Sequence, residues 1–151
     1  MLKLKIPPVV VFLICCALMW AIHKLFPNSG LKLEFRMEIL VSLIAVGGFF
    51  GIVSLYQFAR KSTTVNPHKP QNTNRFVKSG VYKISRNPMY LALVLVLGAA
   101  VFYWGNPFTI VVLPLFVWYM NEFQIKPEEE VMEQKFGDKF VEYRKEVRRW
   151  L

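Results

Sequence analysis

An arginine, an asparagine and a proline stand directly before a long apolar stretch, and together they suggest a binding site for an anion. Asn87 is a favourable N-cap residue and Pro88 suits the first helical position, so a helix is predicted to begin here. A helix start has free N–H groups and a partial positive charge, and Arg86 adds a guanidinium suited to a carboxylate. Tyr90 lies on the same helix face as the cap. A basic, capped helix end with an interfacial tyrosine is the ordinary alternative.

Three consecutive carboxylates form a second candidate. Glu128, Glu129 and Glu130 follow Pro127, which is expected to begin a helix. At the membrane surface, one of them can meet a cation or a sugar hydroxyl. The helix dipole alone also stabilises acidic side chains in a first turn, so no ligand is required. Glu122 is costly near the membrane edge unless it is paired, and we expect it to face the same site.

A turn-forming stretch, SGVYKI at residues 79–84, is the third candidate. Gly80 predicts a tight turn, and Tyr82 offers an aromatic surface that suits a sulfonium or ammonium cation. An interfacial turn without a ligand is the alternative. We expect no metal site, because the sequence shows no cluster of ligands at metal-binding spacing.

The elements that position these residues are apolar enough to be membrane helices. Of the 151 residues 54% are hydrophobic, they occur in long blocks, and the mean hydropathy is +0.34. The predicted fold class is therefore an all-α integral membrane protein with a single domain, residues 1–151. About 20 residues cross the hydrocarbon core, so about four transmembrane helices are expected, at residues 9–26, 37–59, 88–103 and 107–125.

Details of the spans add to this prediction. The first is expected to be a retained helix rather than a cleaved signal peptide, because its apolar run is long and no small-x-small site follows it. Gly47, Gly48 and Gly51 in the second span allow close approach of another helix. Only WGNP, residues 104–107, joins the last two spans, which predicts an antiparallel hairpin. Adjacent Cys15 and Cys16 are expected to be apolar filler without a disulfide.

The net charge of +9 fits either nucleic-acid binding or a membrane face rich in basic residues, and in so apolar a chain we predict the membrane face, with no nucleic acid. Residues 60–88 contain seven Lys or Arg and no acidic residue. With four spans, this loop, the N-terminus and the tail share one side, which the positive-inside rule makes cytoplasmic. Lys24, Lys32 and Arg36 on the other side reduce this bias.

The tail after residue 126 has the pattern of an amphipathic helix interrupted near residues 137–138. It is expected on the cytoplasmic surface, packed against helix ends or the lipid interface. One face is apolar: Met132, Phe136, Phe140, Tyr143, Val147 and Trp150.

In their order and content, SGVYKISRNPMYLAL, the short hairpin and IKPEEEVMEQKFGDKFVEYRKEVRRWL resemble the isoprenylcysteine carboxyl methyltransferase and phospholipid methyltransferase family, here as a bacterial homologue. The resemblance covers about residues 63–151. It implies an S-adenosylmethionine-dependent methyltransferase of the bacterial inner membrane, with residues 1–60 as two generic spans and residues 61–151 holding the cofactor on the cytoplasmic side. The implied acceptor is lipophilic, membrane-embedded or lipidated, for example an isoprenylcysteine carboxylate.

The resemblance also assigns site residues. The family's motifs match Gly80, Val81 and Tyr82, the run from Arg86 to Tyr90, and the paired glutamates. Arg86 and Glu128 are the expected catalytic residues. The expected cofactor-binding residues are Asn74, Arg75, Phe76, Val77, Tyr82, Arg86, Asn87, Pro88, Met89, Tyr90, Glu128 and Glu129.

Two departures concern the acceptor. The eukaryotic isoprenylcysteine enzymes have His where Asn87 stands, and Arg, proposed to meet the substrate carboxylate, where Gln124 stands. Both departures count against a prenylcysteine carboxylate and leave cofactor binding intact. Oxygen, nitrogen and sulfur acceptors all stay open. Two other classes stay open as well: a membrane reductase of the sterol-reductase type, and a non-catalytic scaffold that binds anionic lipid.

Overall fold

The computed structural model describes residues 5–27, 30, 33–60 and 77–151. The described part of the chain is helical and has no β-strand, which confirms the predicted all-α class. Five helices carry the fold: α1 (Pro8–Leu25), α2 (Arg36–Arg60), α3 (Pro88–Trp104), α4 (Val112–Tyr119) and α5 (Lys126–Phe136). The other helical pieces connect or follow them: η2 (Gly80–Lys83), η3 (Pro107–Val111), η4 (Met120–Ile125) and α6 (Asp138–Glu146).

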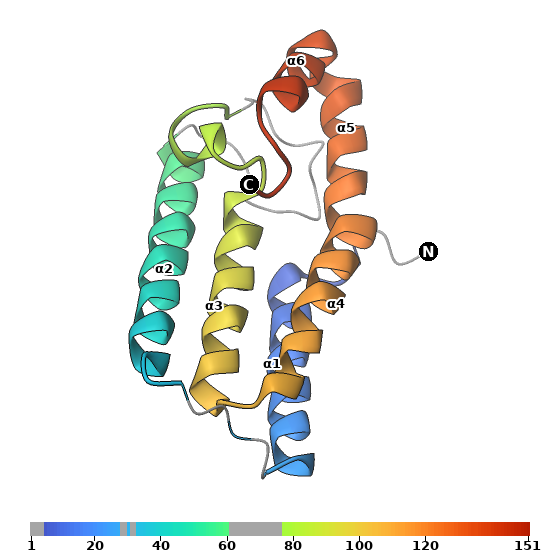
Figure 1. Cartoon of the computed structure of the whole chain (residues 1–151). Coiled ribbons are helices and arrows are strands. Elements are labelled where there is room, and N and C mark those ends of the chain that lie inside the picture. The colour runs from blue at the N-terminus through green and yellow to red at the C-terminus, as the bar shows by residue number, and fades with distance from the viewer. Residues whose placement is uncertain (1–4, 28–29, 31–32, 61–76) are drawn as a thin grey trace.

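The long helices lie side by side, as Figure 1 shows. Three stretches are long and apolar enough to cross a membrane: Pro8–Leu25, Arg36–Arg60 and Pro107–Phe136. α3 is apolar but shorter, since 17 residues correspond to about 26 Å at the usual helical rise. The chain is an integral membrane protein, and α3, which begins at Pro88, is the shortest of these four apolar stretches.

Close packing between α2 and α3 holds the start of α3 in place. A Cβ atom on Gly47 would lie 3.2 Å from the Ala92 carbonyl oxygen and 3.2 Å from Leu95 Cβ, so glycine permits this approach. Gly51 also faces α3, whereas Gly48 faces open space. The predicted role of small residues is thus confirmed for Gly47 and Gly51.

The last span does not end where the sequence suggested. The expected boundary at residue 125 and the new helix at Pro127 are wrong, because η3, α4, η4 and α5 run on as one helix from Pro107 to Phe136. A proline inside a helix lacks one N–H and clashes with the carbonyl four residues earlier. Here the residues before it, Met120–Ile125, form a wider π-helix, which accommodates Pro127 without a break.

Continuity of this helix changes the interpretation of the carboxylates. Glu128 and Glu129 lie in the middle of a 30-residue helix rather than at a free N-terminus. Stabilisation by the dipole of a helix start therefore does not explain them. Their side chains need other partners, which the site below provides.

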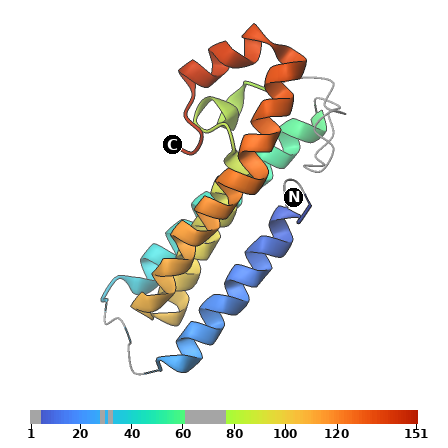
Figure 2. The ribbon, with the colours of Figure 1, turned by 90° about the vertical axis from the view of Figure 1, so that its right-hand side faces the viewer.

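The tail folds back over one end of the bundle. The predicted interruption is confirmed, because α5 ends at Phe136 and Gly137 adopts a φ of 53° before α6. Figure 2 shows α6 turning back beside the end of α5. Phe140, Tyr143 and Val147 pack with Met132 and Phe136, as the amphipathic pattern predicted. Trp150 does not continue that face, because the helix ends at Glu146 and residues 147–151 form a non-helical C-terminal segment.

Candidate functional site

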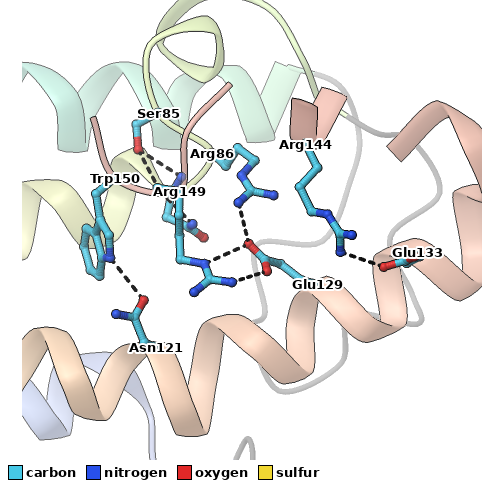
Figure 3. Close-up of polar contacts among 9 residues, drawn as sticks. Ser85, Arg86, Asn121, Glu129, Glu133, Arg144, Arg149 and Trp150 are labelled. Atoms are coloured by element: carbon cyan, nitrogen blue, oxygen red, sulfur yellow. Dashed lines mark hydrogen bonds and ion pairs between the residues drawn. The ribbon is translucent and has the colours of Figure 1, made fainter. Parts of the chain in front are cut away.

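Hydrogen bonds to its main-chain oxygens join the C-terminal segment, residues 147–151, to the start of α3. The Arg86 backbone N–H donates to the Arg148 carbonyl oxygen at 3.0 Å. The Asn87 side-chain amide donates to the Arg149 carbonyl oxygen at 3.0 Å, and the Ser85 hydroxyl donates to the same oxygen at 3.3 Å. Two parts of the chain more than 60 residues apart therefore form one structural unit (Figure 3).

The Asn87 side chain does not cap α3 as predicted. α3 begins at Pro88 as expected, but the Asn87 side chain makes no capping hydrogen bond to the helix. Its amide bonds the C-terminal segment instead. The sequence identified the correct helix start, and the structure corrects the partner of the asparagine.

Glu129 links two arginines at the centre of the site. Arg149 donates to both carboxylate oxygens, from Nε to Oε1 at 3.2 Å and from Nη2 to Oε2 at 2.7 Å. Arg86 Nη2 lies 3.3 Å from Oε1. The Arg86 and Glu129 side chains are only 10% and 12% exposed, so water screens their ion pair little. Figure 3 shows the three side chains pointing toward one another from the start of α3, from α5 and from the C-terminal segment.

Glu128 has a different set of partners, although it is the next residue. Its Oε1 accepts a hydrogen bond from the Tyr90 hydroxyl at 2.7 Å and another from Gln124 Nε2 at 2.7 Å. Tyr90 and Gln124 are both buried. Two neutral donors thus hold Glu128, whereas two cations hold Glu129.

Arg86 keeps unused hydrogen-bonding capacity. Its Nε and Nη1 atoms are buried and have no partner in the described part of the chain. Burial lowers the pKa of Arg86, and the neighbouring Glu129 opposes this shift. Because an unmatched buried donor is costly, these atoms point to an acceptor that completes the site. These two donors lie on different edges of the guanidinium, so a ligand carboxylate can accept from either of them.

Tyr82 lies beside this network in η2. The turn depends on Gly80, which has a φ of 62°. A Cβ atom at this position would overlap the Gln57 side chain. The Tyr143 hydroxyl donates to the Tyr82 carbonyl oxygen at 2.5 Å, which ties α6 to this turn. Burial raises the pKa of both tyrosines above the usual phenol value.

The structure brings most of the predicted site residues to one end of the bundle. Arg86, Tyr90, Glu128 and Glu129 form the polar centre described above. Val77 and Tyr82 belong to an apolar cluster next to it, and Met89 packs on the core between α1, α3 and α4. Pro88 is fully buried at the start of α3. Asn74, Arg75 and Phe76 lie outside the described residues.

One expected member is absent from the site. Glu122 was predicted to face the same site, but it forms an exposed ion pair with Lys126 one helical turn away. The ion pair with Lys126 and partial exposure relieve the cost of its charge. Glu122 is therefore a surface residue of the long helix.

Sequence reasoning also overlooked the contribution of the tail. Arg149 counted only as basic charge, and Gln124 only as a departure from a motif. Trp150 was placed on a helix face, whereas its Nε1 donates to Asn121 Oδ1 at 3.1 Å on the long helix. Only the concentration of basic and aromatic residues after residue 142 signalled this segment.

The fold and the site define an all-helical integral membrane protein with a polar centre at one end of its helices. The chain belongs to the phospholipid methyltransferase family, whose model matches residues 35–139. It is accordingly a membrane methyltransferase. This family match favours a methyltransferase over the reductase and scaffold alternatives.

The chain is also similar to two individual proteins, one of which is a named methyltransferase. An uncharacterized protein of Haemophilus influenzae is 43% identical over 63 residues, which are 42% of this chain and all of that protein. The protein-S-isoprenylcysteine O-methyltransferase of Saccharomyces cerevisiae is 23% identical over 113 residues, which are 70% of this chain and 44% of that enzyme. The chain thus spans less than half of the yeast enzyme. No solved structure matches the chain.

Proposed function

We propose that the chain is an S-adenosylmethionine-dependent methyltransferase that acts on a lipophilic, membrane-embedded or lipidated acceptor. The observation that carries this proposal is the buried guanidinium of Arg86 with two unmatched donors. It precedes the start of α3, and its partner Glu129 directly follows Glu128, which accepts the Tyr90 hydrogen bond. The family and the relatives above supply the reaction class.

Arg86 is the proposed partner of the cofactor's carboxylate, because a guanidinium binds a carboxylate strongly in a buried site. Glu128 and Tyr90 are proposed to face the cationic and polar parts of the cofactor, with Tyr82 as the nearby aromatic wall. Glu129 acts through Arg86, which it holds in place. The adjoining residues from Asn74 to Val77 and from Asn87 to Met89 are proposed to complete this cofactor site.

When bound, the cofactor supplies an electrophilic methyl group on a sulfonium sulfur. The task of the protein is then to align the acceptor with that methyl group and to exclude water, and alignment alone contributes about 7–11 kcal/mol in favourable cases. A carboxylate or thiolate acceptor needs no base. An amine must first lose a proton, and the Glu128 carboxylate is the proposed proton acceptor.

We further propose that the site faces the cytoplasm across a bacterial inner membrane. The end of α2, the start of α3 and the C-terminal segment lie at the same end of the bundle (Figure 1), and the basic residues concentrate in the segments on this side. An acceptor anchored in lipid can then approach from within the bilayer while the water-soluble cofactor enters from the cytosol.

Labelling tests the reaction class. Membranes that contain the chain are incubated with methyl-labelled S-adenosylmethionine, and lipids and lipidated products are extracted and identified. We expect label in a lipophilic product, at a level well above that of membranes without the chain. Label at the background level in every lipophilic fraction would contradict the proposal.

A further inference from the structure

The two arginines hold Glu129 unequally. Arg149 bonds both carboxylate oxygens, at 3.2 and 2.7 Å, whereas Arg86 approaches one oxygen at 3.3 Å. Paired hydrogen bonds between a guanidinium and a carboxylate are stronger and more directional than a single contact. Glu129 is thus bound mainly to Arg149 and secondarily to Arg86.

The backbone fixes Arg149 in position. Its carbonyl oxygen accepts hydrogen bonds from Ser85 and Asn87, and the following residue, Trp150, donates to Asn121. None of these three contacts involves the Arg149 guanidinium. The guanidinium can therefore bind Glu129, and 30% of the Arg149 side chain is exposed.

Competition between the arginines has a consequence for Arg86. If the Arg149 side chain were absent, Glu129 would have two free oxygens facing the nearest remaining cation. That cation is Arg86, and a two-point pair through Nη2 would also occupy one of its donors that is now unmatched. By occupying Glu129, Arg149 keeps Arg86 available.

We propose that Arg149 is a positioning residue, which binds Glu129 at two points and so keeps Arg86 from a two-point pair with Glu129, leaving its Nε or Nη1 donor to the cofactor's carboxylate. This inference rests on the proposed function, because it assumes a cofactor at Arg86. Arg149 itself needs no contact with the cofactor or with the acceptor. Its effect passes through Glu129.

A double-mutant cycle tests the inference. The affinity for S-adenosylmethionine is measured by calorimetry in detergent for the wild type, Arg149→Gln, Glu129→Gln and the double variant. In the presence of Glu129, Arg149→Gln is expected to weaken binding about tenfold, whereas in the Glu129→Gln background it changes affinity less than about twofold. A purely structural role of Arg149 predicts a loss of similar size in both backgrounds.

Arg144→Gln is the matched control, because Arg144 forms its more exposed ion pair with Glu133 rather than with Glu129. It should leave the affinity unchanged, and unfolding temperatures of all variants verify that the fold persists. Equal losses in both backgrounds, or no loss in Arg149→Gln, would overturn the role of Arg149 while leaving the proposed function standing. A wild type that does not bind the cofactor would overturn both.

Discussion

Replacing Arg86 with alanine is expected to lower the rate of methyl transfer at low cofactor concentration by about 10- to 150-fold. A buried hydrogen bond to a charged group is worth about 1.5–3 kcal/mol, which corresponds to this range. The effect should be largest in kcat/KM for S-adenosylmethionine, because the guanidinium is proposed to bind the cofactor rather than to react. Transfer of labelled methyl groups in membranes, followed over a range of cofactor concentrations, measures this change in kcat/KM.

The fold is expected to survive this substitution. Glu129 keeps its two-point pair with Arg149, so no buried carboxylate is left without a cation. The backbone N–H of residue 86 can still donate to the Arg148 carbonyl oxygen. Arg144→Ala, which removes an exposed arginine of α6, should transfer methyl groups at the wild-type rate. An Arg86→Ala variant as active as this control would rule out the proposed role of Arg86.

Glu128 is expected to show the second large effect, and two substitutions separate its charge from its shape. Glu128→Gln retains an oxygen that can accept the Tyr90 hydrogen bond, so it should fold normally and lose most methyl-transfer activity. Glu128→Ala leaves the buried Tyr90 hydroxyl and Gln124 amide without their acceptor. It should therefore also lower the free energy of unfolding by about 1–3 kcal/mol for each donor left unmatched.

Activity assays and thermal unfolding in detergent measure both effects on the same preparations. Glu133→Gln is the control, because Glu133 lies on the same helix and its ion pair with Arg144 is exposed; it should keep its activity and lose at most about 1 kcal/mol of stability. Retention of wild-type activity by Glu128→Gln would show that the negative charge is dispensable. The carboxylate would then be a structural acceptor for Tyr90 and Gln124 alone.

The sequence allowed the helix start at Pro88 and its neighbours to be predicted, because the relevant signals are local. Each signal acts within a few residues: Pro88 at the first helical position, the apolar run after it, and Gly80 at the start of the turn η2. The close approach at Gly47 was predictable for the same reason, since small residues in a span favour tight helix packing. Residues with local signals thus account for the span positions and for Arg86 and Tyr90 at one end.

Interactions between distant residues were not predictable. The continuation of the helix through Pro127 depends on the π-helical turn at Met120–Ile125, which has no simple sequence signature. The pairing of Arg149 with Glu129 joins α5 to a non-helical segment 20 residues further on. The charge pattern of a sequence does not show which charged residues pair with each other. The contacts of Arg149 with Glu129 and of Gln124 with Glu128 are therefore seen only in the structure.

Calorimetric titration of the purified wild-type chain in detergent tests the central claim most directly. S-adenosylmethionine and a reduced nicotinamide dinucleotide are titrated in parallel, since the second is the ligand of the reductase alternative. Saturable binding of S-adenosylmethionine at one site per chain, with none of the nicotinamide, is the predicted result. Binding of the nicotinamide dinucleotide alone, or of neither ligand, would contradict it.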